Sequence, residues 1–396
     1  MEKFILTISF LFLTSASYTQ WEPVSIPGED TVYCLSSVNQ CIIAGCKNSV
    51  YRSLNYGLKW ISSGNGLNYS PVKVIENINS NFYLGSNNIF KSSNMGINWF
   101  CINNQFSNFY AYSFLSTNNY LLCGVSSGIL KTTNEGINWI LLTNGLNAQD
   151  IKCIKNIGNL LFAGTSNGIY RSFNQGDYWT LNYAQGVNVN CFASYDTKLF
   201  AGITNYGVKV TTNLGYTWEN FNTGLNNFNI NSLIIYSDII FAGTDIGVFA
   251  SPVNDNYWIL YNSGFDVNPK VNCLNLFKNY IYAGTSGKSV WRRMIFDFAG
   301  IENNISNIPD KISLSQNYPN PFNPNTIIKF QINKNSFVSL KIYDVLGIEV
   351  ATVVNKFIKA GEYETTFKGS GFTSGIYFYK LTAGNFSETR KMILLK

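Results

Sequence analysis

Tyr51-Arg-Ser-Leu-Asn-Tyr-Gly-Leu-Lys-Trp60 decides the fold of this 396-residue chain, because its pattern, Ser/Thr-x-Asn-x-Gly-x-x-Trp, recurs along the sequence. Four further good copies end at Trp99, Trp139, Trp179 and Trp218, and a worn copy ends at Trp258. The spacing between successive tryptophans is nearly constant, which indicates a structural unit of about 40 residues that is repeated along the chain.

Each good copy contains the residues of a tight turn. Serine, threonine and asparagine side chains can bond nearby backbone N–H groups, glycine accepts a left-handed backbone, and the tryptophan ring favours burial. We therefore predict a structural role for all of these turn residues. They are Ser53, Asn55, Gly57, Trp60, Asn94, Gly96, Trp99, Asn134, Gly136, Trp139, Asn174, Gly176, Trp179, Asn213, Gly215 and Trp218.

A second landmark, a glycine that usually follows alanine, occurs seven times. These glycines recur with the same period as the tryptophans, at Gly45, Gly85, Gly124, Gly164, Gly202, Gly243 and Gly284. The seventh repeat has no equivalent tryptophan, but Trp21 lies one full period before Trp60. We therefore predict that the start of the mature chain supplies the last strand of the seventh repeat.

A period of about 40 residues with four short strands in each unit is typical of a β-propeller. In one repeat, alternating apolar residues predict strands over residues 151–156, 160–164, 168–172 and 179–182. A single small sheet cannot bury both its faces, whereas a ring of sheets can. The chain is thus predicted to be all-β, with a seven-bladed β-propeller over residues 20–299 that is closed by the N-terminal strand.

The repeated turn resembles the Asp-box, or BNR, repeat of the sialidase-like β-propellers, with asparagine in place of the usual aspartate. Five good copies carry this resemblance. In that family the turn is a folding element on the outer rim, far from the ligand face, and the resemblance implies the same role here. The chain also resembles photosystem-II-stability-type propellers at the level of the fold, which implies an assembly factor as a further class.

Sialidase activity finds little support in these residues. The chain contains no histidine, which excludes Ser-His-Asp triads, Cys-His pairs and His-ligated metal sites. Sialidases need an arginine triad, but Arg52, Arg171 and Arg292 occupy equivalent positions of different repeats. We expect no catalytic residues, no cofactor and no metal, so a non-enzymatic role is favoured.

Four carboxylates are candidates for a ligand site on the face formed by the loops before each first strand and between the second and third strands. Glu29 and Asp30 precede the first repeat, Asp245 lies in the sixth, and Asp266 precedes the seventh. Because these repeats are neighbours in a closed ring, the four could cluster and bind a carbohydrate or a cation. They could equally be ordinary turn residues.

The other loops of that face are rich in serine, threonine and asparagine, and Asn167 and Tyr206 are further candidate ligand-binding residues. Such loops can hold a sugar or a peptide through hydrogen bonds, and tight turns also require these residue types. We expect a non-enzymatic glycan- or protein-binding scaffold. A polysaccharide-acting glycoside hydrolase of the Asp-box propeller type, which needs paired carboxylates, is the alternative.

The net charge limits the expected partners, and the positions of the cysteines indicate the state of their thiols. The net charge is +6, and residues 21–300 carry 16 basic and 14 acidic side chains without a long basic run, so no nucleic-acid partner is expected. Four of the eight cysteines, Cys34, Cys153, Cys191 and Cys273, occupy an apolar position of the predicted first strands. We therefore expect mostly free, buried thiols in a monomer.

The chain begins with the features of a secretory signal peptide. Lys3 precedes an apolar run over residues 4–13, and small and polar residues follow. The run is shorter than the ~20 residues that cross a bilayer, and no other segment is long and apolar enough. Residues 1–19 are therefore predicted to be removed during export.

The repeat ends before a polar linker over residues 300–311, and residues 312–396 form a different module. Its strands are predicted over residues 326–332, 337–344, 349–354, 361–368, 375–383 and 386–395, which favours a small Ig-like β-sandwich. An ordinary adhesion module is one interpretation of such a sandwich.

Several motifs of this module point to a more specific family. Leu314-Ser-Gln-Asn-Tyr-Pro-Asn-Pro-Phe-Asn-Pro324, Ile342-Tyr-Asp-Val-Leu-Gly347, Ser374-Gly-Ile-Tyr-Phe-Tyr379 and Lys391-Met-Ile-Leu-Leu-Lys396 follow in order. Together they resemble the type A C-terminal sorting domain of the type IX secretion system. The resemblance implies recognition by that machinery and a secreted or outer-membrane-surface location in a Gram-negative bacterium.

Overall fold

The computed structural model describes residues 20–29, 31–47, 49–67, 71–103, 106–107, 109–147, 150–295, 309–333, 336–358, 360–384 and 386–396. All regular secondary structure in these ranges is β-strand. None of the described segments forms a helix of the length and apolarity needed to cross a membrane. The predicted signal peptide, residues 1–19, and most of the predicted linker lie outside the described residues.

Residues 32–260 form six antiparallel sheets, each built from four consecutive strands. In the fourth repeat every strand end lies within one residue of its predicted position. The strands of the six sheets are β2 (Val32–Val38), β3 (Cys41–Cys46), β4 (Val50–Ser53), β5 (Ile61–Ser62); β6 (Val74–Ile78), β7 (Asn81–Gly85), β8 (Ile89–Ser92), β9 (Phe100–Cys101); β10 (Ala111–Ser116), β11 (Leu121–Val125), β12 (Gly128–Thr132), β13 (Ile140–Leu142); β14 (Ile151–Ile157), β15 (Leu160–Thr165), β16 (Gly168–Ser172), β17 (Thr180–Tyr183); β18 (Val189–Tyr195), β19 (Lys198–Ile203), β20 (Gly207–Thr211), β21 (Glu219–Asn220); and β22 (Ile230–Tyr236), β23 (Ile239–Thr244), β24 (Gly247–Pro252), β25 (Ile259–Leu260).

A seventh sheet joins the two ends of this region. It contains β26 (Lys270–Phe277), β27 (Tyr280–Ser286), β28 (Val290–Met294) and, as its fourth strand, β1 (Glu22–Pro23). β1 pairs antiparallel with β28, so that Glu22 lies opposite Arg292, and their side chains form an ion pair of 2.6 Å. The start of the chain therefore completes the sheet that its last repeat begins.

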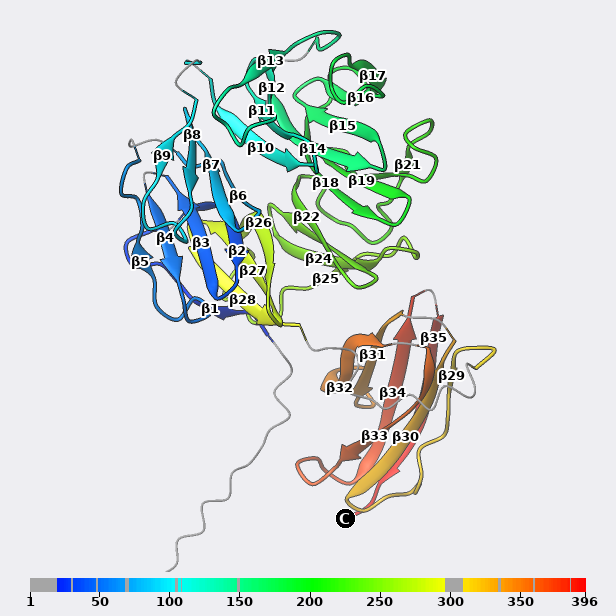
Figure 1. Ribbon diagram of the computed structural model, residues 1–396. Helices are drawn as coiled ribbons and strands as arrows, with labels where there is room; N and C mark the ends of the chain where they lie inside the picture. The colour runs from blue at the N-terminus through cyan, green and yellow to red at the C-terminus, as the bar shows by residue number, and fades with distance from the viewer. Residues whose placement is uncertain are drawn as a thin grey trace, which may run out of the picture.

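The seven sheets follow one another in a closed order. The first strands contact their neighbours in the sequence β2, β6, β10, β14, β18, β22 and β26, and β26 also contacts β2. Figure 1 shows this arrangement, with β26 and β27 (yellow) close to β2 (blue). Separate apolar clusters lie between neighbouring sheets; one of them combines Val74 and Tyr83 of the second sheet with Phe114 and Trp139 of the third.

The repeated turn has the same hydrogen bonds in its five good copies. In the first copy, Ser53 Oγ accepts a hydrogen bond from the backbone N–H of Gly57 (2.9 Å), and Asn55 Oδ1 accepts one from the N–H of Lys59 (2.9 Å). Gly57 has a φ of 83°. The single side-chain oxygen of Asn55 accepts hydrogen bonds from both Ser53 Oγ and the N–H of Lys59, so an amide can serve where a carboxylate would otherwise stand.

Most of the tryptophans that follow these turns link their sheet to the preceding one. Trp60 Nε1 donates to the carbonyl oxygen of Val24 (2.7 Å), and Trp99 Nε1 donates to that of Ser63 (2.8 Å). Trp21 makes the equivalent bond of 2.7 Å to Tyr261, and its ring is 1% exposed. Trp21 therefore has the contacts of a repeat tryptophan, although it precedes the first complete repeat.

The landmark glycines leave space for cysteine side chains of the first strands. A Cβ atom on Gly45 or on Gly284 would lie 2.5 Å from the Sγ atom of Cys34 or Cys273, respectively. Glycine is therefore needed for close approach of the strands rather than for a special backbone angle. All eight cysteines are free, and burial raises the pKa of Cys273 to about 12.

The C-terminal module has two antiparallel sheets over one apolar core. Leu314, Phe330 and Tyr379 are among the core residues that lie 2% exposed or less. The short strand β29 was not predicted, and β32 continues to Ile358, beyond its predicted end at residue 354, whereas the other strands lie within one residue of their predicted ranges. The sheets are β29 (Ser313–Leu314), β30 (Asn325–Ile332), β33 (Gly361–Lys368), and β32 (Glu349–Ile358), β31 (Ser336–Tyr343), β34 (Gly375–Ala383), β35 (Phe386–Leu394).

Candidate ligand-binding face

One face of the ring of sheets carries the start of every first strand and the end of every second strand; we call it the loop face. Here the first strand of six sheets contains a β-bulge, an extra residue without a partner in the second strand. In the second sheet the equivalent residue directly precedes β6. These seven half-buried residues, which we call the axial ring, are Tyr33, Lys73, Tyr112, Lys152, Asn190, Asn231 and Asn272.

The three asparagines of the axial ring are structural. Asn190 Nδ2 donates to the carbonyl oxygen of Ile230 in the next sheet, at 2.9 Å. Asn272 Nδ2 donates to the carbonyl oxygen of Val32 at 2.9 Å, which links the seventh sheet to the first. Asn231 makes the corresponding bond. These amides therefore bond backbone carbonyl groups across the junction of two sheets, where polar groups need hydrogen-bond partners.

The first four sheets replace these asparagines with longer side chains. In the first sheet Cys34 Sγ lies 3.8 Å from the equivalent carbonyl oxygen, that of Val72, and in the third Ser113 Oγ lies 3.5 Å from that of Ile151. A neighbouring side chain thus faces the carbonyl group that an axial-ring asparagine serves elsewhere. Within the described residues, no hydrogen bond joins the tyrosine and lysine side chains of the axial ring to that carbonyl group; Tyr112 instead interacts with Asp150 of the next sheet, and the Lys73 ammonium group lies over the Tyr33 ring.

These four side chains form an alternating aromatic and cationic arc. Lys73 Nζ lies 4.9 Å from the centre of the Tyr33 ring, which is within the range of a cation–π interaction. Burial, together with the neighbouring Asp150 carboxylate, raises the pKa of Tyr112 to about 12. Burial lowers the pKa of Lys152, and Asp150 partly opposes this effect. The arc therefore holds one lysine, Lys73, over an aromatic ring and another, Lys152, in a partly desolvated position.

The predicted residues Glu29, Asn167 and Tyr206 lie in the loops, and Asp30 lies outside the described residues. Glu29 accepts a hydrogen bond from Ser49 Oγ at 2.8 Å. Asn167 joins two loops, since its Nδ2 donates to the carbonyl oxygen of residue 147 and its Oδ1 accepts from the N–H of residue 186. The Tyr206 side chain is accessible to a ligand, because the residue is 55% exposed.

The predicted carboxylates Asp245 and Asp266 each pair with a separate lysine. Asp245 Oδ1 lies 3.0 Å from Lys270 Nζ, and Asp266 Oδ2 lies 3.2 Å from Lys288 Nζ. Burial tends to raise the pKa of Asp245, but hydrogen bonds from Asn231 and Lys270 lower it overall. The hydrogen bond from Lys288 lowers the pKa of Asp266. Both carboxylates are thus charged groups that already have partners.

Among the described residues, Glu29, Asp245 and Asp266 share no hydrogen-bond or ion-pair partner. Each of them bonds a different partner. Across the ranges that the structure describes, no group of three or more histidine, cysteine, aspartate or glutamate side chains is arranged to hold a metal ion. The loop face therefore offers neutral and cationic groups to a ligand more readily than acidic ones.

Glu76, in the middle of β6, is a further group that sequence analysis did not single out. It reaches solvent although its strand belongs to the ring of first strands. The surrounding strands remove much of its hydration, which raises the pKa of Glu76 to about 7, and Lys155 acts in the opposite direction. The folded protein therefore disfavours the charged form of this carboxyl group.

Replacing Glu76 with glutamine should stabilise the protein at pH 8 and have no such effect at pH 4. A raised pKa means that the native state loses stability as pH rises from about 4.5 to about 7. The gain at pH 8 should be ~1 kcal/mol, after allowance for solvent screening. Urea denaturation at both values of pH measures it.

Glu135→Gln provides the control with the opposite sign. The Lys91 ammonium group hydrogen-bonds Glu135 and lowers the pKa of its carboxyl group. Removing this charged hydrogen bond with Glu135→Gln should therefore slightly destabilise the protein at pH 8. An equal response of both variants to pH would contradict the assignment for Glu76.

Sequence analysis missed the axial ring because it considered the strands and turns of each repeat rather than one position across all repeats. A signal was nevertheless present. The axial-ring residue lies at the same distance before the landmark glycine in all seven repeats, as Tyr33 does before Gly45. Comparing that one position across the repeats separates the tyrosines and lysines of the first four from the asparagines of the last three.

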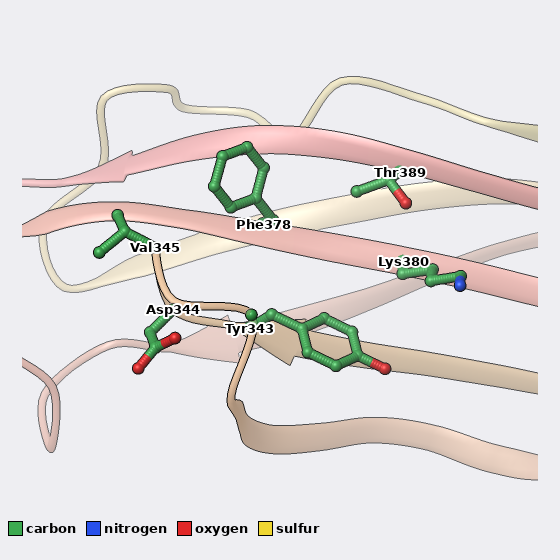
Figure 2. Close-up of a pocket in the computed structure, with 7 residues that line it drawn as sticks. Tyr343, Asp344, Val345, Phe378, Lys380 and Thr389 are labelled. Carbon is green, nitrogen blue, oxygen red and sulfur yellow. The ribbon is translucent and has the colours of Figure 1, made fainter.

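The C-terminal module contains a cavity of about 320 Å³. Figure 2 shows Asp344 and Val345, in the loop after β31, on one side of it, and Phe378 and Lys380 of β34 on the other. Asp344 Oδ1 holds this loop by accepting hydrogen bonds from the N–H groups of residues 346 and 348, both at 2.9 Å. The loop exposes Leu346 to 79%.

Residues 316–395 match the secretion system C-terminal sorting domain. This domain indicates export by the type IX secretion system, and the protein is accordingly secreted or located at the cell surface of a bacterium. A search of curated protein sequences found no match to the chain.

Solved structures with repeated four-stranded sheets support a propeller-like fold. The extracellular domain of a one-component system from B. thetaiotaomicron aligns with a TM-score of 0.58 and 14% identity over 95% of this chain, which spans 59% of that domain. YCF48 bound to D1 peptide aligns with a TM-score of 0.57 and 12% identity, covering 71% of this chain and 98% of YCF48. YCF48 from Cyanidioschyzon merolae gives a TM-score of 0.54 and 14% identity, over 69% of this chain and 98% of its own.

Proposed function

We propose that this protein is an exported binding protein that recognises a glycan or a protein through its loop face without catalysing a reaction. The observation that carries the proposal is the axial ring. Three of its positions hold asparagines that bond a backbone carbonyl group of the next sheet, whereas four hold tyrosine or lysine side chains that do not bond that group in the described structure. Side chains that do not bond the backbone at such a position can turn their polar groups to a ligand.

The proposal includes a specific domain organisation. Residues 20–299 form a seven-bladed propeller of the Asp-box type, closed by the N-terminal strand; residues 1–19 are a signal peptide, and residues 300–311 are a linker. Residues 312–396 form an Ig-like sorting domain that engages the type IX machinery. The seven sheets, the contact of β26 with β2 and the pairing of β1 with β28 support this organisation.

Separate observations support a glycan and a protein as the ligand. The polar loops and exposed aromatic rings of the loop face suit a glycan. A protein ligand is suggested by the likeness to YCF48, which was solved with a bound peptide. The rival function, hydrolysis of a polysaccharide, is less favoured because Asp245 and Asp266 are already paired with lysines.

A binding experiment with face-specific variants tests the proposal. The purified protein is applied to glycan and peptide arrays, and the products of any bound glycan are analysed by mass spectrometry. Replacing the exposed loop-face residues Tyr110 and Tyr206 with alanine should weaken binding roughly tenfold or more. Tyr178→Ala, at an exposed tyrosine of a repeated turn, should leave binding unchanged. Equal losses in both variants, or cleavage of the bound glycan, would overturn the proposal.

A further inference from the structure

We propose that the arc of Tyr33, Lys73, Tyr112 and Lys152 binds the carboxylate groups of an acidic glycan, one that contains uronic acids. This inference rests on the proposed function and names the ligand class of the same face. It follows from the charge of the arc, from the position of its lysines and from the groups that surround it.

The arc carries positive charge that the protein does not fully neutralise. Among the described residues, neither Lys73 nor Lys152 forms an ion pair within 4.0 Å, unlike Lys270 and Lys288 on the same face. The neighbouring acid, Asp150, interacts with both Tyr112 and Lys152. Its single charge cannot offset both lysines, and an anionic ligand would supply the missing charge.

The arc is also held in position before a ligand arrives. The bulges fix the backbone of Tyr33, Tyr112 and Lys152 within paired strands. The N–H group of Lys73 donates to the carbonyl oxygen of Gly85, and its ammonium group lies over the Tyr33 ring. Residues held in this way lose little conformational freedom on binding, so charge attraction contributes more fully to affinity.

The desolvation of Lys152 favours binding of a carboxylate over binding of a neutral hydroxyl group. Burial removes water from this ammonium group, which lowers its pKa because the charged form is left poorly solvated. A ligand carboxylate in contact with Lys152 would restore the lost stabilisation through a charge-assisted hydrogen bond. A neutral sugar hydroxyl could do so only weakly.

The surroundings of the arc favour a glycan over an acidic peptide. The loops of the same face expose the aromatic rings of Tyr110, Tyr206 and Phe228 to 45%, 55% and 44%. Flat rings of this kind offer apolar faces on which sugar rings can pack. A peptide bound as an added strand would need a free sheet edge, but β2 and its equivalents, the edge strands that carry the arc, already contact neighbouring first strands.

The test compares acidic and neutralised forms of the same glycan. Calorimetry is carried out with oligosaccharides of galacturonate, glucuronate and mannuronate, with their methyl esters, and with poly-glutamate as the acidic peptide. We expect at least one uronate oligosaccharide to bind, and its methyl ester to bind roughly tenfold more weakly or worse. Absence of binding by every uronate oligosaccharide, or equal binding of the ester, would overturn the inference.

Variants then assign the binding to the arc. Combined Lys73→Gln and Lys152→Gln substitution should reduce uronate binding to the level of the ester, whereas Lys73→Arg with Lys152→Arg should retain most of it. Lys59→Gln with Lys278→Gln removes the same charge from exposed residues outside the arc and should change little. Thermal unfolding of every variant verifies that it is folded.

The outcomes separate this inference from the function on which it rests. Equal or tighter binding of poly-glutamate would reassign the arc to an acidic peptide and overturn the glycan class. If the Tyr110 and Tyr206 variant loses ligand binding but the lysine variants do not, the loop face remains the binding site and the role of the arc is refuted.

Discussion

Replacing Trp21 with alanine should lower the free energy of unfolding by about 3–5 kcal/mol, the usual cost of removing a buried tryptophan. The ring is 1% exposed, stacks on Phe265 with a centroid distance of 4.8 Å, and donates its Nε1–H to the carbonyl oxygen of Tyr261. Its loss removes apolar contacts and also leaves that carbonyl group without this donor. The effect is large because these contacts join the N-terminal strand, which completes the seventh sheet, to the sixth sheet.

Equilibrium denaturation of the purified variants measures this effect. Trp258→Ala should cost a similar amount, because Trp258 makes the same kind of bond, 2.7 Å to the carbonyl oxygen of Phe221. Ser25→Ala, at an exposed residue of the same N-terminal segment, is the matched control and should change stability by less than about 0.5 kcal/mol. A loss for Trp21→Ala no larger than that of the control would mean that the first strand contributes little to the closed ring.

Gly145→Ala should destabilise the protein by about 2–4 kcal/mol, for two separate reasons. Gly145 has a φ of 77°, which side chains disfavour. A Cβ atom there would also collide with the backbone carbonyl oxygen of Trp179 in the next sheet. That contact lies beside the hydrogen bond from the N–H of Trp179 to the carbonyl oxygen of Asn144 (3.0 Å), so the collision must push two sheets apart.

Gly186→Ala separates the cost of the backbone angle from the cost of the collision. Gly186 has a similar φ of 83°, is also exposed, and has no atom within 4 Å of an added Cβ. It should therefore cost only the backbone penalty, about 1 kcal/mol. Chemical denaturation of both variants gives the cost of the collision as a difference. Equal losses would mean that the neighbouring sheet can move aside without cost.

Much of the fold could be predicted because the repeat encodes it locally. The Ser–Asn–Gly turn fixes a loop within a short stretch of chain, and alternating apolar residues fix the strands on either side of it. The count of landmark glycines against tryptophans also predicted the pairing that is observed between β1 and β28. The same approach overlooked the two-residue strand β29, because so short a strand has no periodicity to detect.

The candidate site was less predictable, because its properties arise between sheets. The sequence suggested that carboxylates from the sixth, seventh and first repeats could gather, but Asp245 and Asp266 are each held by a lysine of the following part of the chain. The axial ring was overlooked since its importance depends on which of its side chains bond a backbone carbonyl group of the next sheet. That information is not contained in any single repeat.

By itself the sequence determined the number and kind of the repeated units, their turns and the sorting module at the end of the chain, because each depends on residues that are close together in the chain. Only the tertiary structure decided which side chains are available for a ligand. Asn190 and Lys152 hold the same position in the repeat, but Asn190 bonds the next sheet, whereas the ammonium group of Lys152 is desolvated beside Asp150. That difference arises from contacts across a sheet junction, where hydrogen bonding and hydration depend on neighbours distant in sequence.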